Sequence, residues 1–128
     1  MELNEAVDFC NRWLSSWTGN KPDELIKFYS LNAFYSDPAV PEGLTGHKQI
    51  LPYFKKLLAV NPKWKWEHKE IFLTEKGFNL KWKATIPIGD IVITEFGLDI
   101  VEIANAAVTR NEVYFDRTKL LKALKKSG

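Results

Sequence analysis

The spacing of the apolar residues changes at residue 63 of this 128-residue chain. Before that point, apolar residues recur at the three- and four-residue intervals that are typical of amphipathic helices. After it, apolar and polar residues alternate, as they do in half-buried strands. A chain that places helices first and strands afterwards is expected to form an α+β domain, with a curved antiparallel sheet wrapped around the N-terminal helices.

Three helices are predicted before this change and one near the end of the chain. The first covers residues 3–17, and a short second helix begins at Pro22, a residue that suits a first helical turn. Residues 41–46 are rich in Gly and Pro and predict a loop, which the third helix follows at residues 47–60. Asp116 precedes the final amphipathic helix, where it would be a good N-cap.

Four long strands are expected to follow the third helix as a meander. They begin at residue 63 and continue over residues 78–88, 91–103 and 108–115. The alternation slips near Glu70, which indicates a β-bulge. The strand at 91–103 is apolar on both faces, so we expect it to be central or covered on both sides.

The composition limits the kinds of protein that this chain can be. A mass of 14.8 kDa indicates a single domain, residues 1–128. The net charge is +2 and the basic residues form only short groups, so no nucleic-acid partner is expected. No apolar run approaches the ~18 residues that cross a bilayer, and the acidic start lacks a signal-peptide pattern, so we expect no membrane partner and a cytoplasmic location. Cys10 has no second cysteine to pair with and is expected in the core.

Asp37 is the first candidate for chemistry, because it follows two aromatic residues and precedes a Pro-Ala-Val-Pro run. Desolvation raises the pKa of a carboxyl group, and a raised pKa suits a general base near neutrality. The alternative is that Asp before Pro starts a turn and accepts hydrogen bonds from nearby backbone N–H groups. Five Trp residues favour an aromatic-lined cavity or interface in addition to a core.

Glu95 and Asp99 form a second candidate site, because they share one face of the 91–103 strand with Gly97 between them. If that face lines a pocket, the pKa of one carboxyl group rises, since like charges in a low dielectric do not both ionise easily. Alternatively, both acids are solvated or paired with basic residues of neighbouring strands. His47 and His68 lack the partners of a metal site, and no Gly-rich phosphate loop is present, so neither a metal nor a cofactor is expected.

The chain as a whole resembles the NTF2-like superfamily, and within it the polyketide-cyclase-like (SnoaL-like) and ketosteroid-isomerase-like branch. The resemblance covers nearly the whole chain. It is carried by an aromatic-x-x-Asp-Pro segment at 34–38, by Gly46-x-x-x-Ile50, by the meander and by Tyr-Phe-Asp at 114–116. It implies a conical barrel with a deep pocket, and a homodimer.

The resemblance also implies roles for individual residues. Asp37 matches the base of the isomerases, and Asp99 matches their protonated Asp, which donates a hydrogen bond to the developing oxyanion. Asp116 matches the acid/base Asp of the cyclases. Trp13 falls where the isomerases have a Tyr, and an indole N–H is a larger donor that points differently. With Glu95, the expected pocket-lining residues are Trp13, Trp17, Phe34, Tyr35, Trp82 and Tyr114.

Two functions are compatible with these residues. The first is cofactor-free acid/base catalysis, as in an isomerase or cyclase, on a small and mainly apolar carbonyl compound. Asp37 would abstract a proton, while Asp99 and Trp13 would stabilise the enolate oxygen. The alternative is a non-catalytic module that binds a small apolar ligand or another protein, since Trp and Tyr are also enriched in binding anchors.

Overall fold

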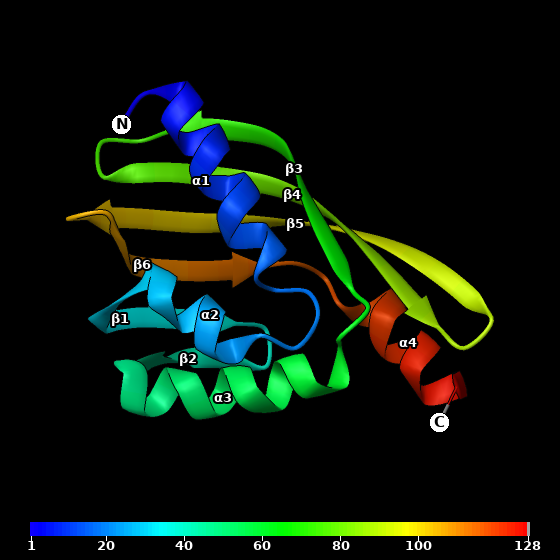
Figure 1. The fold of residues 1–128 in the computed structure, drawn as a ribbon. Coiled ribbons are helices and arrows are strands. Elements are labelled where there is room, and N and C mark those ends of the chain that lie inside the picture. The colour runs from blue at the N-terminus through cyan, green and yellow to red at the C-terminus, as the bar shows by residue number, and fades with distance from the viewer. Residues whose placement is uncertain (128) are drawn as a thin grey trace.

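The computed structural model describes residues 1–127, which form a curved six-stranded sheet with helices packed against one of its faces (Figure 1). The strand order is β2-β1-β6-β5-β4-β3. Neighbouring strands are antiparallel except for β1 and β6, which are parallel. The sheet is therefore curved, mixed and open, with β2 and β3 at its edges, whereas the sequence pattern predicted an antiparallel sheet and the resemblance implied a conical barrel.

The first helix, α1 (Leu3–Ser15), buries one side formed by Ala6, Phe9, Cys10, Trp13 and Leu14. It ends two residues earlier than predicted, because the chain turns at Gly19 and Asn20, which both have positive φ. Trp17 lies in this turn and is still buried. Cys10 is a core residue as predicted, and burial is the main cause that raises the pKa of its thiol to about 12.

Two short helices, α2 (Pro22–Leu25) and η1 (Ile26–Phe28), lead into β1 (Tyr29–Asp37). The next segment is a strand, β2 (Val40–Thr45), where the sequence predicted a loop. β2 pairs only with β1, and an edge strand tolerates the Pro and Gly residues that favoured a loop. Gly43 has a φ of 87°, and a Cβ there would lie 2.2 Å from the Phe34 ring, so this position requires glycine.

The helix α3 (His47–Val60) covers the same face of the sheet as α1 and buries Ile50, Phe54 and Leu58. Phe54 is fully buried, and its ring contacts three other aromatic rings edge-on. The ring centroids are 5.1 Å apart for Trp17, 5.3 Å for Tyr29 and 5.1 Å for Tyr35. Edge-to-face packing of this kind stabilises beyond the area it buries. This aromatic cluster joins α3, β1 and the turn that follows α1.

The predicted meander is confirmed. Its strands are β3 (Lys65–Leu73), β4 (Gly77–Ile88), β5 (Ile91–Ala104) and β6 (Ala107–Tyr114). The β3 register shifts between His68 and Glu70, at the predicted bulge. β5 lies between β4 and β6, and its alternate residues Ile93, Glu95, Asp99 and Val101 are buried on the helix-covered face. We call this the inner face of the sheet.

The last helix, α4 (Thr118–Ser127), lies at the end of the sheet where the β4–β5 hairpin extends beyond β6 (Figure 1). β6 ends opposite Leu98, so the first half of β5 has a free edge there. Lys119 Nζ of α4 donates a hydrogen bond of 3.1 Å to the Thr94 carbonyl on this edge. Within residues 1–127, no helix has both the length and the apolar content required to span a membrane.

Replacing Phe54 with Ala is expected to lower the free energy of unfolding by about 3–5 kcal/mol, because it removes a fully buried ring and leaves a cavity. Urea unfolding followed by far-UV circular dichroism measures this loss. Phe72→Ala is the matched control. Phe72 is 49% exposed on the edge strand β3, and its loss should cost less than about 1 kcal/mol. Equal losses in the two variants would show that the aromatic cluster is not the centre of the core.

Candidate active site

A cavity of about 270 Å³ opens between the inner face of the sheet, α3 and α4. Most of its wall is apolar or aromatic. Its aromatic residues are Trp17, Tyr35, Tyr53, Trp64, Trp66, Trp82 and Phe115. Its ionisable groups, apart from the tyrosines, are Asp37, Glu95, Asp99 and Arg117. An apolar cavity with a few polar groups is the usual form of a small-molecule site.

Asp37 ends β1 at the wall of this cavity and accepts four hydrogen bonds. The hydroxyl groups of Tyr35 and Tyr53 each donate to Oδ2 at 2.7 Å. The backbone N–H groups of Ala39 and Val40 donate to Oδ1 at 2.8 and 3.2 Å. A carboxylate offers about four acceptor positions, so all are occupied. The turn interpretation of Asp37 is confirmed, and the side chain also lines the cavity.

The two tyrosines are held in the neutral, donating form by the same arrangement. Burial raises the pKa of Tyr35 well above its ordinary value, and the charge of Asp37 raises it further. Burial, followed by the hydrogen bond to Asp37, also raises the pKa of Tyr53. The guanidinium group of Arg117 opposes this rise, so Arg117 acts on the Asp37 end of the cavity.

Asp99 lies on the inner face of β5 and is only 4% exposed. Trp82 Nε1 donates to its Oδ1 at 2.7 Å, and Asn111 Nδ2 donates to its Oδ2 at 3.0 Å. Burial raises the pKa of Asp99 to about 7. The two hydrogen bonds oppose the rise, and the charge of Asp37 adds to it. Each oxygen keeps an acceptor position, so Asp99 can exchange a proton near neutral pH.

Gly97 allows the hydrogen bond between Trp82 and Asp99. Trp82 and Gly97 are direct partners across β4 and β5, and the indole ring lies over the glycine. A Cβ at residue 97 would be 2.1 Å from Trp82 Cζ2, much closer than van der Waals contact. The glycine between the two acids of β5 therefore leaves room for the tryptophan that reaches Asp99.

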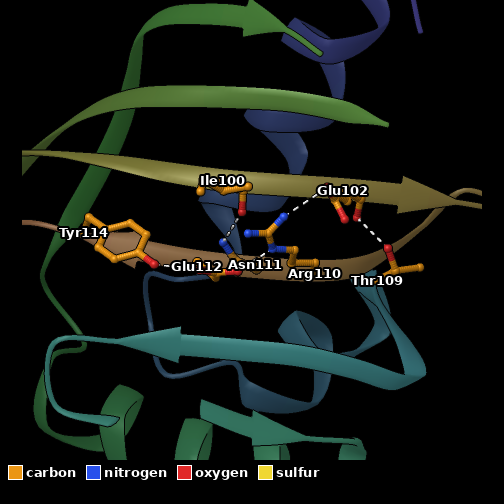
Figure 2. Close-up of polar contacts among 7 residues, drawn as sticks. All are labelled: Ile100, Glu102, Thr109, Arg110, Asn111, Glu112 and Tyr114. Atoms are coloured by element: carbon orange, nitrogen blue, oxygen red, sulfur yellow. Dashed lines mark hydrogen bonds and ion pairs between the residues drawn. The ribbon is translucent and has the colours of Figure 1, made fainter. Parts of the chain in front are cut away.

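A chain of hydrogen bonds supports Asp99 from behind. Trp13 Nε1 donates to the Tyr29 hydroxyl at 3.3 Å, and this hydroxyl donates to Asn111 Oδ1 at 2.8 Å. Asn111 Nδ2 then donates to Asp99. Figure 2 shows the second contact of Asn111, in which Nδ2 lies 3.5 Å from the Ile100 carbonyl oxygen. Trp13 is fully buried and is not part of the cavity lining. The expectation that its N–H faces a ligand is wrong, because that N–H binds Tyr29.

Glu95 also lines the cavity, as predicted, and is 8% exposed. Its Oε1 is buried without a hydrogen-bond partner among the described residues. The predicted alternative, pairing with basic residues across the sheet, does not hold, because Lys81, Lys83 and Arg110 pair with other glutamates. Within the described part of the chain, the acids of the cavity do not form a group of three or more His, Cys, Asp or Glu that fits a metal ion.

Asp116 lies outside this cavity and is exposed. Its Oδ1 accepts hydrogen bonds from the Thr118 backbone N–H at 2.9 Å and from the Thr118 hydroxyl at 2.6 Å. These bonds lower the pKa of its carboxyl group. The predicted capping role is confirmed, although α4 begins at Thr118 and Asp116 therefore lies one residue before the N-cap position. The structure places Asp116 outside the cavity that Asp37 and Asp99 line.

Phe34 and Tyr114 also lie outside the cavity lining, because side chains alternate between the two faces of a strand. Tyr35, Val113 and Phe115 face the cavity, so Phe34 and Tyr114 face the opposite side. Phe34 packs on Gly43, and the Tyr114 hydroxyl donates to Glu112 on that outer face (Figure 2). Trp17, Tyr35 and Trp82 lie in the lining as predicted.

Several site residues were missed from the sequence, among them Tyr53, Trp66, Asn111 and Arg117. Tyr53 and Arg117 lie in α3 and just before α4, where they resemble ordinary helix residues, and only the tertiary fold brings them to the cavity. Asn111 had a recognisable signal. It is a polar residue on the inner face of β6, with the apolar Val113 at the next inward position, and it is fully buried. A buried polar side chain requires a partner, which here is Asp99.

Comparison with known proteins identifies the fold. No protein-family model and no curated protein matches this chain. Similar solved structures include a putative SnoaL-like polyketide cyclase from Shewanella putrefaciens CN-32, with a TM-score of 0.80 at 12% identity over 98% of this chain and 88% of that one. AclR, a putative hydroxylase from Streptomyces galilaeus, gives a TM-score of 0.77 at 15% identity over 98% of both chains.

A third similar structure is a protein from Catenulispora acidiphila DSM 44928 with a ketosteroid isomerase-like fold, in complex with trimethylamine. It gives a TM-score of 0.77 at 15% identity over 90% of both chains. Further neighbours are described as NTF2-like or SnoaL-like proteins of unknown function. At these identities the likeness concerns the fold. The chain has the NTF2-like α+β fold that the resemblance implied.

The raised pKa of Asp99 predicts that stability falls as the pH rises. The unfolded chain loses this proton near pH 4 and the folded protein near pH 7, so folding favours the protonated form. Between these values, the free energy of unfolding is expected to fall by up to about 1.4 kcal/mol per pH unit, and the loss is complete above pH 7. Urea unfolding across this range should show the slope in the native protein, and Asp99→Asn should abolish it.

Histidine is the side chain that ordinarily changes charge at physiological pH, so the comparison is repeated with both His47 and His68 replaced by Gln. In that background, the slope should persist while Asp99 is present and disappear when Asp99→Asn is added. An equal slope with and without Asp99 would contradict its raised pKa.

Proposed function

We propose that the cavity binds a small, mainly apolar carbonyl compound and that Asp99 acts on it as a cofactor-free general base. The observation that carries the proposal is the buried Asp99 in the wall of an apolar cavity, with a pKa raised to about 7. A base with a pKa near the working pH combines a usable fraction of carboxylate with useful basicity. The aromatic wall fits an apolar substrate.

In the proposed reaction, the Asp99 carboxylate removes a proton from the carbon next to the carbonyl group. The C–H electrons form the C=C bond of an enolate, and the carbonyl π electrons move to oxygen. In an isomerisation, Asp99 then returns the proton to another carbon. In a cyclisation, the enolate carbon forms a C–C bond to a second carbonyl carbon of the same molecule, the π electrons of that carbonyl move to its oxygen, and Asp99 returns the proton to this oxygen. Arg117 is the cation of the cavity lining and supplies a positive charge that favours the enolate oxygen.

Asp37 has a different role in this proposal from the one that the resemblance implies. Its four acceptor positions are occupied, so taking a substrate proton would require it to give up a hydrogen bond. Asp37 instead positions Tyr35 and Tyr53, and its negative charge contributes to the raised pKa of Asp99. The base is therefore assigned to β5 rather than to the end of β1.

The structural neighbours are compatible with this assignment. They include putative polyketide cyclases and a protein with a ketosteroid isomerase-like fold, alongside proteins of unknown function. A shared fold places a site without fixing its chemistry, so the proposal rests on Asp99 and its surroundings.

The test uses 2-tetralone, a small apolar ketone with acidic α-hydrogens. The protein is expected to accelerate exchange of these hydrogens with D₂O, measured by proton NMR. The rate should rise as the pH passes about 7, because the base must be a carboxylate. Asp99→Asn is expected to lower the protein-dependent rate by about 10²-fold or more.

Asp116→Asn is the matched control, because Asp116 lies outside the cavity, and its exchange rate should equal that of the native protein. Undiminished exchange in Asp99→Asn would overturn the assignment of the base. Binding of 2-tetralone without any exchange, seen as a change in Trp fluorescence, would instead favour the non-catalytic ligand-binding function.

We also propose that two copies of the chain associate through the outer face of the sheet. Val92, Phe96, Leu98 and Tyr114 present an apolar strip there, and Phe96 is 53% exposed. These residues alternate with buried inner-face residues of β5 and β6, so the strip is continuous across two strands. An exposed apolar patch of this kind is typical of an interface.

Sedimentation velocity at micromolar concentration is expected to show a dimer that Phe96→Lys converts to a monomer, because a buried unpaired charge is costly. Leu3→Lys is the control. Leu3 is 53% exposed on α1, on the other side of the molecule, and its replacement should leave the dimer intact. A native protein that sediments as a monomer would contradict the proposal.

A further inference from the structure

The side chain of Glu95 is buried without the partners that a buried carboxylate requires. It is 8% exposed, lines the cavity, and has a completely buried Oε1 with no hydrogen-bond partner among the described residues. Asp37 and Asp99, the other acids of this cavity, have four and two hydrogen-bond donors respectively. Burying a charged group without a partner is costly, so this position is suited to receiving a donor from outside the chain.

The basic side chains near Glu95 do not supply that donor. Lys119 Nζ binds the Thr94 carbonyl, and Arg117 acts on Tyr53 at the Asp37 end. A groove beside α4 is bordered by Glu95 and Asp116 and contains Lys119, Lys122 and Lys126. None of the ion pairs within 4.0 Å in the described part of the chain includes Glu95. Across the whole cavity, three carboxylate side chains face one guanidinium group.

The space around Glu95 is set by its neighbours across the sheet. Trp66 on β3 pairs with Ala84 on β4, and Ala84 pairs with Glu95 on β5, so the three form one row on the inner face. Ala84 is the small residue in the middle of this row. It leaves room between the indole of Trp66 and the carboxylate of Glu95, and all three residues line the cavity.

The aromatic side of this row is extended by other tryptophans. The Trp66 ring centroid lies 6.1 Å from that of Trp17 and 6.2 Å from that of Trp64, and both rings belong to the cavity wall. Aromatic faces carry negative electrostatic potential and attract organic cations, and the indole ring of Trp attracts them most strongly. A carboxylate opposite a tryptophan wall is therefore suited to a positively charged donor rather than to an anion.

We propose that the Glu95–Ala84–Trp66 row is a subsite for the ammonium group of a small amine. The ammonium N–H groups donate to the carboxylate of Glu95, and the carbon substituents lie against the tryptophan wall. If the proposed function holds, the ammonium subsite implies that the substrate is a carbonyl compound that also carries an amine. The amine subsite itself is a binding property that does not require turnover.

The test compares three ligands of nearly equal size. Benzylamine is protonated at neutral pH, benzyl alcohol is a neutral hydrogen-bond donor, and toluene has no polar group. Isothermal titration is expected to show that benzylamine binds at least about tenfold more tightly than either neutral ligand, since each tenfold step corresponds to about 1.4 kcal/mol. Glu95→Gln, which keeps the size and removes the charge, should abolish this advantage.

Glu102→Gln is the matched control, because Glu102 lies on the same strand but faces the outer side, where it pairs with Arg110 (Figure 2). It should retain the preference for benzylamine. Thermal unfolding gives a second reading in case Glu95→Gln changes the fold. Benzylamine should raise the midpoint of the native protein, and Glu95→Gln should raise the midpoint of the ligand-free protein, because it removes an unpaired buried charge.

Equal binding of benzylamine and benzyl alcohol would overturn the assignment of a cation. Equal binding of benzylamine by the native protein and Glu95→Gln would overturn the role of Glu95. Neither result bears on Asp99, because benzylamine has no carbonyl group, and a failure of 2-tetralone exchange leaves this binding comparison unaffected.

Discussion

The hydrogen bonds that Trp82 and Asn111 donate to Asp99 organise the centre of this molecule. They join three neighbouring strands through one buried carboxyl group, and Tyr29 and Trp13 extend the connection to β1 and α1. Removing one partner from such a network costs more than the bond itself, because it leaves a buried polar group unsatisfied. The network therefore fixes the geometry of the inner face and holds Asp99 at the cavity.

The arrangement of helices and strands could be predicted from the sequence because it depends on local periodicity. The alternation in β5 correctly placed Glu95 and Asp99 on one face, and the slip near Glu70 correctly marked a bulge. The parallel pairing of β1 with β6 joins segments about 75 residues apart, and no local pattern encodes it. β2 was missed for a related reason, since its Pro and Gly residues favour a loop unless an adjacent strand pairs with them.

The candidate site was predictable in its residue types and less so in its contacts. Four carboxylates and several aromatic residues were expected, and Asp37, Glu95 and Asp99 do line one cavity, whereas Asp116 lies outside it. Their different chemical states depend on partners that come from elsewhere in the fold. Tyr53 on α3 completes the shell of Asp37, whereas no side chain among the described residues completes that of Glu95. Burial and pairing decide whether a carboxylate is structural or reactive, and neither can be read from alternation alone.

Asp99 and Glu95, the two acids on which the proposed functions of the cavity depend, also lower the stability of the fold. The buried Asp99 lowers the free energy of unfolding above pH 7, and burying Glu95 without a hydrogen-bond partner for Oε1 also costs stability, whereas apolar side chains of similar size would stabilise both positions. The chain nevertheless places Gly97 between them, which admits Trp82, and Ala84 beside Glu95, which leaves space. The poorly compensated carboxylates lower stability, and the small residues beside them leave space in the cavity. This combination is expected of a binding site rather than of a core.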